Sequence, residues 1–213
     1  SMPLFIVQKR QFDAFAAAQA DSQQSWLKTT KFSANAGQFT CLPDQNGGMG
    51  SAIVVMGKTP LWDIAKAARD LPAGSWHPDF TFAADIAVSD IQLGWGLAQY
   101  KFAPHKTTDT DNALPELALS DTALCIDSSA LVLGTHIVRE MVNLPANQMT
   151  PAGIEQAARE IAQACSARFS VVSGEALESY APALHTVGRA AEIGPRMIQL
   201  LWGDSGPVIT LVG

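Results

Sequence analysis

Short apolar runs bounded by turn residues predict the strands of a mixed α/β unit in the first part of the chain. The run Ala52–Met56 is almost wholly apolar, as expected of a central strand that is covered on both faces of its sheet. The other runs are shorter or alternate, and glycine, proline or polar residues flank each of them. We therefore predict strands over Leu4–Val7, Gly37–Pro43, Ser51–Gly57, Thr81–Ile86 and Leu117–Ile126.

Helices and loops are predicted between these strands. Apolar residues of Leu61–Leu71 recur three and four positions apart and predict an amphipathic helix, and Asp90–Phe102 carries large apolar residues with small ones between them, as in a buried helix. The segment Ala103–Pro115 is rich in Pro, Thr, Asp and Asn, which predicts an exposed loop. Within the turn Asp44–Gly50, the pair Asn46-Gly47 predicts a type I′ hairpin turn.

The chain changes character at Asp127. Ser128 or Ser129 can cap a helix that continues to Leu144 and stops at Pro145. Beyond it we predict a helix with a clean apolar stripe, a strand, a short helix and two more strands, over Thr150–Cys165, Phe169–Ser173, Gly174–Tyr180, Arg196–Trp202 and Val208–Val212. This alternation of strand and helix favours an α/β sheet with some parallel pairing.

The composition is that of a globular protein. Of the 213 residues, 47% are hydrophobic and 16% are charged, which excludes intrinsic disorder. The formal net charge is −6 and no block of basic residues stands out, so nucleic acid is not an expected partner. No apolar run approaches the roughly 18 residues of a membrane span, and no secretory signal is visible. We expect a soluble, cytoplasmic protein, with Ser1 left over from tag removal.

Candidate reactive residues do not form a site by spacing alone. His136 and Glu140 stand four positions apart on a predicted helix and could face one metal ion. A zinc site needs three or four ligands, so a polar helix face is the preferred interpretation of this pair. The other histidines lie in a predicted solvated turn beside Asp79, in the exposed loop, or alone, at His77, His105 and His185. No Ser, His and Asp arrangement suggests a nucleophile with its base.

Three glycine-containing segments could bind an anion. Gly47–Gly50 could hold a phosphate with its backbone N–H groups, but a strand follows it, so a hairpin turn is preferred. In Gly188-Arg189 and Gly194-Pro195-Arg196 the arginine guanidinium could bind an anion, but structural salt bridges are the favoured interpretation. The cysteines are far apart and are predicted to be small buried residues in a reducing compartment, at Cys41, Cys125 and Cys165. We assign no catalytic, cofactor-binding or metal-ligating residue.

One segment is specific enough to identify a family. Residues 139–151 read Arg-Glu-Met-Val-Asn-Leu-Pro-Ala-Asn-Gln-Met-Thr-Pro, an Arg-acidic pair followed by Asn-x-Pro, a second Asn and a Thr-Pro helix start. This segment resembles the leucyl aminopeptidase family, the cytosolic two-metal exopeptidases. The similarity continues through His185–Ala190, Pro195–Ile198 and Thr210–Gly213, and upstream into Leu93–Phe102. It covers residues 90–213, and the first 90 residues are compatible with the family's variable N-terminal domain.

The resemblance implies a fold and an activity. The fold is α/β, with a macrodomain-like N-terminal domain (residues 1–127), a connecting helix (128–144) and the truncated start of an α/β catalytic domain (145–213). The activity implied for the full-length family member is metal-dependent removal of N-terminal amino acids from peptides, with two divalent ions, zinc or manganese. The implied assembly is a homohexamer, and no membrane partner is expected.

The family's metal ligands cannot be placed on this sequence. In the family, the strand ending in Leu-Val-Gly continues into Lys-Gly and then into acidic ligands, whereas the last lysine here is Lys106 and the sequence ends at Gly213. Two-metal hydrolysis needs several anionic ligands around ions about 3.5–4 Å apart. We therefore expect this chain alone to be inactive, architectural in role, and prone to associate through unpaired apolar strands. The alternatives are a free-standing macrodomain-like module that binds ADP-ribose or a related nucleotide near Gly47–Gly50, and an interaction protein without a catalytic half.

Overall fold

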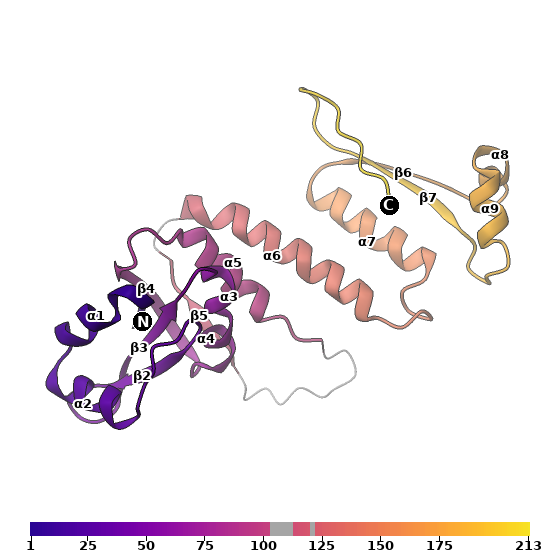
Figure 1. Ribbon diagram of the computed structural model, residues 1–213. Helices are drawn as coiled ribbons and strands as arrows, with labels where there is room; N and C mark the ends of the chain where they lie inside the picture. The colour runs from indigo at the N-terminus through magenta and orange to yellow at the C-terminus, as the bar shows by residue number, and fades with distance from the viewer. Residues whose placement is uncertain (103–112, 120–121) are drawn as a thin grey trace. The chain divides into compact units, whose positions relative to one another are not determined.

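The computed structural model of the chain describes residues 1–102, 113–119 and 122–213, with side chains from residue 126 onward in the last range (Figure 1). The described residues form two compact units, Ser1–Val138 and Arg139–Gly213, and each is considered by itself. Most of the predicted loop Ala103–Pro115, with His105, lies outside the described residues. None of the described helices combines the length and the hydropathy needed to span a bilayer.

A five-stranded sheet forms the centre of the first unit. Its order is β2-β3-β1-β4-β5, with β2 (Phe39–Pro43) antiparallel to β3 (Met49–Met56) and the remaining neighbours parallel, namely β1 (Met2–Gln8), β4 (Gly74–Phe82) and β5 (Pro115–Leu117). The predicted strands in the first 57 residues are confirmed. The central position of β1 and β3 explains their apolar sequences, because side chains on both faces are covered.

The fourth strand lies earlier in the sequence than predicted. Only its last two residues fall within the predicted strand Thr81–Ile86, and Ala83–Ile86 forms a turn closed by the bond from Ile86 N–H to Ala83 C=O, 3.0 Å. His77 and Asp79 therefore lie within β4 and not in a solvated turn. The signal was hidden by Pro78, which is tolerated because β5 pairs only with Gly74–Trp76 and leaves that edge of β4 open.

Helices cover both faces of this sheet. On one face, α1 (Phe12–Ala18) and α2 (Asp21–Thr29) pack Phe15 and Leu27 against alternate residues of β1 and β3. On the other face lie α3 (Pro60–Asp63), α4 (Ala65–Asp70) and α5 (Val88–Ala98). The predicted helix Leu61–Leu71 is thus divided between α3 and α4. The buried helix predicted over Asp90–Phe102 is confirmed as α5, although it ends at Ala98.

Two glycines allow α5 to approach its neighbours closely. A Cβ atom at Gly94 would lie 2.0 Å from the Leu61 carbonyl oxygen of α3, and one at Gly96 would lie 2.6 Å from a methyl group of Val132. Both distances are far shorter than a van der Waals contact. Glycine is therefore required at these two points of α5 by space, because its neighbours occupy the volume of a methyl group.

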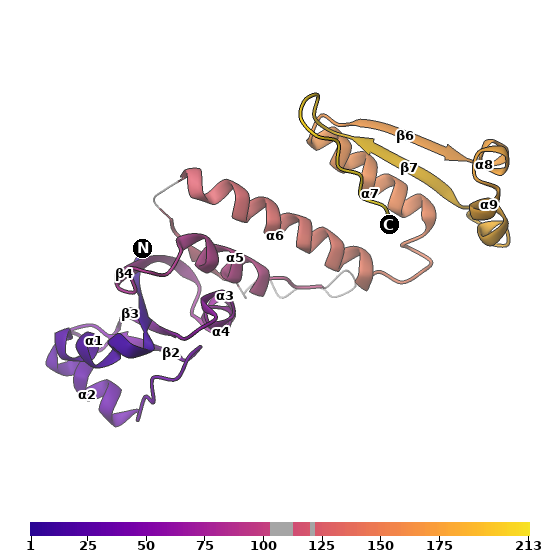
Figure 2. The same ribbon diagram turned by 45° about the horizontal axis from the view of Figure 1, so that its top comes forward.

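The long helix α6 (Thr122–Asn143) begins before the predicted capping serines. Ser128 lies inside the helix, is 4% exposed, and donates a hydrogen bond from its Oγ to the Ser89 carbonyl at 3.4 Å. The strand predicted over Leu117–Ile126 is wrong, because β5 ends at Leu117 and α6 already occupies residues 122–126. The predicted end before Pro145 is confirmed, since proline cannot continue the backbone hydrogen bonds of a helix. Figure 2 shows α5 running beside α6, as Figure 1 does.

The second unit is a helix on a two-stranded antiparallel sheet. Thr150 caps α7 (Pro151–Ala164) by accepting the Gly153 N–H at 3.2 Å, as its sequence predicts. β6 (Arg168–Ser173) pairs with β7 (Arg196–Leu201), and α8 (Glu175–Tyr180) and α9 (Pro182–Gly188) connect them (Figure 2). The expected parallel pairing is absent among these described residues, where the single strand pair is antiparallel.

The strand predicted over Val208–Val212 does not form. No residue after Leu201 belongs to a strand, and Val208 and Val212 are each 92% exposed. A strand is stabilised by hydrogen bonds to a neighbour, and none of the described strands pairs with this segment. The apolar pattern is therefore present without the partner that would turn it into a strand.

Candidate functional site

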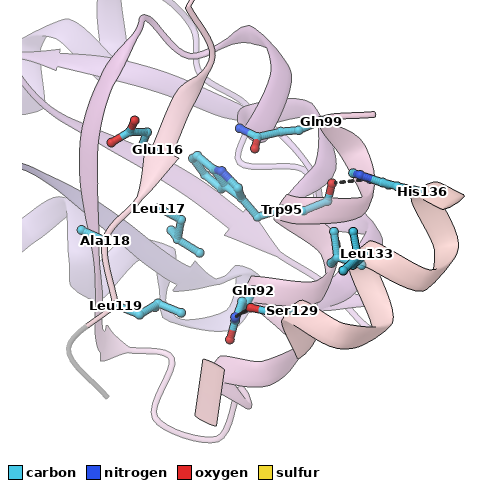
Figure 3. Close-up of a pocket in the computed structure, with 12 residues that line it drawn as sticks. Gln92, Trp95, Gln99, Glu116, Leu117, Ala118, Leu119, Ser129, Leu133 and His136 are labelled. Carbon is cyan, nitrogen blue, oxygen red and sulfur yellow. Dashed lines mark hydrogen bonds between the residues drawn. The ribbon is translucent and has the colours of Figure 1, made fainter. Parts of the chain in front are cut away.

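The candidate site is a pocket of about 660 Å³ in the first unit, between α5, β5 and α6 (Figure 3). Its volume lies within the range of small-molecule sites, roughly 300–1,000 Å³. Three elements that are distant in sequence contribute to it, and it is lined by Gln92, Trp95, Gly96, Gln99, Glu116, Leu117, Ala118, Leu119, Ser129, Val132, Leu133 and His136.

The polar groups around Trp95 are engaged in the fold itself. The indole Nε1 donates to the Pro115 carbonyl at 3.3 Å, and the Gln99 side-chain amide donates to the same carbonyl at 2.6 Å. These bonds attach the start of β5 to α5. Gln92 donates in the same way to the Ser129 Oγ at 3.1 Å and attaches α6. The polar side chains therefore hold the walls of the pocket together.

His136 is a structural residue of this pocket. Its Nε2 lies 3.1 Å from the Gly96 carbonyl oxygen (Figure 3). The centre of its ring lies 5.2 Å from that of Tyr100. A carbonyl only accepts, so Nε2 carries the proton and has no lone pair for a metal ion. The contact is possible because α6 lies close to Gly96, and the sequence pattern did not predict this approach.

In the glycine-rich turn, the side chain of Asp44 already binds the backbone N–H groups that could hold an anion. The Asp44 Oδ1 accepts the backbone N–H groups of Asn46 and Gly48, each at 2.8 Å, so the donors that would hold a phosphate are already bonded. The hairpin prediction is confirmed, but the type I′ turn is wrong. Gly47 has a φ of +81° and Asn46 is not among the positive-φ residues. The Asp44 N–H donates to the Gly48 carbonyl at 2.8 Å and closes a three-residue loop, with Gly47 in the left-handed position.

Arg196 takes part in a structural ion-pair network, as the sequence favoured. Its Nε donates to Glu155 Oε2 at 2.6 Å, and Arg159 donates to the other oxygen of that carboxylate at 2.7 Å. The guanidinium of Arg159 also lies 4.4 Å from the centre of the Phe169 ring. Hydrogen bonds from Arg159 and then Arg196 hold the pKa of Glu155 below its ordinary value. The network connects α7 to both strands of its sheet.

The described residues do not offer a metal site, since no group of three or more His, Cys, Asp or Glu side chains converges within them. Cys41 is half-buried in β2, and burial raises the pKa of its thiol. Cys165 is exposed, which contradicts the prediction that it is buried. The Cys125 side chain lies outside the described ones. His185 lies on α9. The pocket offers apolar surface and no assembled nucleophile.

Two domains of one peptidase family follow each other along the chain. Residues 2–119 match the M17 aminopeptidase N-terminal domain, and residues 136–213 match the catalytic domain of the cytosol aminopeptidase family. The first match alone covers more than half of the 213 residues. The chain therefore belongs to the M17, or cytosol, aminopeptidase family.

Individual relatives agree with this assignment. A probable cytosol aminopeptidase from Stenotrophomonas maltophilia (strain K279a) is 27% identical over 231 residues, which cover 94% of this chain and 46% of that protein. The crystal structure of the cytosol aminopeptidase from Coxiella burnetii matches with a TM-score of 0.85 at 24% identity, over 95% of this chain and 44% of that one. The bottromycin maturation enzyme BotP in complex with Mn matches with a TM-score of 0.73 at 19% identity, over 93% and 44%. These two structures show the fold, and the chain spans less than half the length of each relative.

Proposed function

We propose that this chain is the N-terminal portion of a metal-dependent aminopeptidase that removes N-terminal amino acids from peptides. The observation that carries the proposal is the order of the two family domains, residues 2–119 and 136–213. We take the second of these as the beginning of a catalytic domain, because more than half of the length of each relative lies outside the part that matches this chain. The substrates and the cytoplasmic location are carried over from the family as part of this proposal.

The metal ions are assigned to residues outside the described ones. BotP is a relative in fold whose structure contains Mn, which supports a divalent ion, manganese or zinc, in the full-length protein. The described residues do not fit such an ion, because they bring no three ligating side chains together. We therefore derive no catalytic step through a metal ion, and we assign no catalytic residue to this chain.

The proposed role of the 213 residues is architectural. The hydrogen bonds of Gln92, Gln99 and His136 attach α6 and β5 to α5 and fix the shape of the first unit. Exposed apolar side chains on α6, among them Leu131 and Leu133, are available for contacts between subunits. A homo-oligomer, a hexamer by family resemblance, is the assembly that we propose.

A leucyl-anilide assay tests whether the catalytic activity requires residues beyond these 213. The purified 213-residue chain, supplied with manganese or zinc, should release no anilide, whereas the same chain extended through the rest of a catalytic domain should be active. Turnover by the 213-residue chain that disappears on chelation would overturn the assignment of the ligands. If the extended protein also proved inactive on a panel of peptides, the aminopeptidase proposal itself would be wrong.

Nucleotide binding receives no support from the turn that first suggested it. The carboxylate of Asp44 already occupies the N–H groups of Asn46 and Gly48, and it would repel a phosphate placed there. We expect a calorimetric titration with ADP-ribose to give no heat of binding. A saturable heat would bring back the binding-module interpretation of the first unit.

A further inference from the structure

A second hollow, of about 430 Å³, lies between α1 and α2 and is called here the α1–α2 groove. Its floor is apolar, with the rings of Phe12 and Phe32 in tilted contact at 5.7 Å and Leu27 buried beside them. Its rim is polar and charged. The groove is lined by Phe12, Asp13, Ala16, Ala17, Gln24, Leu27, Lys28, Lys31 and Phe32.

The groove is held open by bonds within the fold. The side-chain amide of Gln24 donates to the Gln19 carbonyl at 2.9 Å, and that of Gln19 donates to the Phe15 carbonyl at 3.1 Å. These bonds fix the connection between α1 and α2, so the separation of the helices does not depend on a ligand. A preformed groove lowers the entropy that a binding partner would have to lose.

The charge of the groove is opposite to that of the chain. The lining contains Lys28, Lys31 and a single carboxylate, Asp13, so it carries a net charge of +1 in a protein whose formal net charge is −6. Neither lysine forms an ion pair with any of the described residues. Two ammonium groups beside an apolar floor complement a carboxylate that is close to an apolar side chain.

Lys31 occupies a backbone position that favours glycine. Its φ is +50°, and the bonds from Lys31 N–H to Lys28 C=O and from Phe32 N–H to Leu27 C=O define a Schellman motif at the end of α2. Glycine is the usual residue at this left-handed position, because a Cβ atom is strained there. Lys31 keeps this strained backbone position and lines the groove, a combination that is often found at binding sites.

We propose that the α1–α2 groove binds an acidic peptide segment of a partner protein. An apolar side chain of the segment packs on Phe12, Leu27 and Phe32, and its neighbouring carboxylates lie against Lys28 and Lys31. The volume accommodates one or two such side chains, so the contact is small and weak, and its affinity depends on ionic strength. The proposal is independent of the peptidase assignment, since it concerns a groove in the first unit.

The direct test is fluorescence anisotropy with a labelled hexapeptide of Asp and Glu around a central Leu-Phe pair. The peptide is N-acetylated and amidated, so that it is no substrate for an aminopeptidase. We expect saturable binding at or below about 1 mM that weakens as salt is raised. Matched peptides with Lys for the acidic residues, or Gly-Ser for Leu-Phe, should not bind. Equal binding of the lysine peptide, or no saturation at about 1 mM, overturns the proposal.

Substitutions separate binding from stability. Lys31→Gly removes the charge and the backbone strain, so it should raise the unfolding midpoint while weakening the peptide two- to fivefold. The variant that carries both Lys31→Gly and Lys28→Gln should bind the peptide about tenfold more weakly than the parent. Ser166→Gly is the control, because Ser166 has a φ of +54° at the end of α7 in the other unit. It should gain stability and leave peptide binding unchanged.

Two outcomes refute a peptide site in this groove. Unchanged affinity in the variant that carries both lysine substitutions would show that the peptide binds elsewhere. Competition by inorganic phosphate at the same concentration as the peptide would show a simple anion site, in which the apolar floor has no role. An affinity that falls with both lysine substitutions and with loss of the Leu-Phe pair supports the proposal.

Discussion

Replacing Gly94 by alanine tests how closely α5 packs on α3. The added Cβ would meet the Leu61 carbonyl oxygen at 2.0 Å and a methyl group of Ile64 at 2.6 Å. The carbonyl belongs to the backbone and cannot rotate away, so one of the two helices has to move. Gly134 is the matched control, because a Cβ atom there meets nothing within 4 Å on the helix α6.

The two substitutions are expected to change the free energy of unfolding in opposite directions. Overpacking costs about 1–3 kcal/mol or more, and this clash with backbone belongs at the upper end. Alanine regains up to about 1 kcal/mol of helix preference over glycine. We therefore expect Gly94→Ala to lower the free energy of unfolding by about 2 kcal/mol and Gly134→Ala to raise it by about 0.5–1 kcal/mol.

Urea denaturation followed by tryptophan fluorescence measures both variants. Four of the five tryptophans lie in the first unit, at Trp26, Trp62, Trp76 and Trp95, so the signal reports mainly on the unit that contains both glycines. A Gly94→Ala protein as stable as the parent would refute the packing argument. A destabilised Gly134→Ala protein would show that the space around α6 has been misjudged.

Three further predictions concern other parts of the chain. Because its arginine bonds hold the pKa of Glu155 below the ordinary 4.5, the carboxylate stabilises the fold fully above that pH and loses its effect as pH falls through the lower, folded-state value. Glu155→Gln should therefore flatten the acid side of a thermal-stability profile, and an unchanged profile contradicts this. His136→Ala should lower the first unit's free energy of unfolding by about 1 kcal/mol or more, measured by the same fluorescence, through loss of the bond to Gly96. The exposed Val208 and Leu211 should promote self-association, so the sedimentation coefficient should depend on protein concentration. Aspartate at both positions should reduce this dependence, and an unchanged dependence contradicts the prediction.

The elements that the sequence predicted correctly are those in which local pattern and burial agree. β3 is apolar because both of its faces are covered, and α7 has a capping threonine, a proline at its first position and an apolar stripe. The short helices α1 and α2 had no comparable signal. Residues Phe12–Ala18 are mostly alanine and phenylalanine, and only the tertiary contacts of Phe15 with the sheet fix their position.

The errors have physical causes that a local pattern cannot show. Pro78 is compatible with a strand only because one edge of β4 is open, and this is a property of the topology. The apolar segment Val208–Val212 has the pattern of a strand without a neighbour. The pocket was missed because it requires β5 and α6 to meet α5, and the residues at which they meet are separated by up to 40 positions.

The central place of β1 in its sheet has a consequence for synthesis. Met2–Gln8 is synthesised before both of its neighbours, β3, which starts at Met49, and β4, which starts at Gly74. The sheet cannot close until the second of these has been synthesised, so β1 must stay without one or both of its neighbours for most of that interval. A chain without Met2–Gln8 would keep two strand pairs, β2–β3 and β4–β5, with no strand between them.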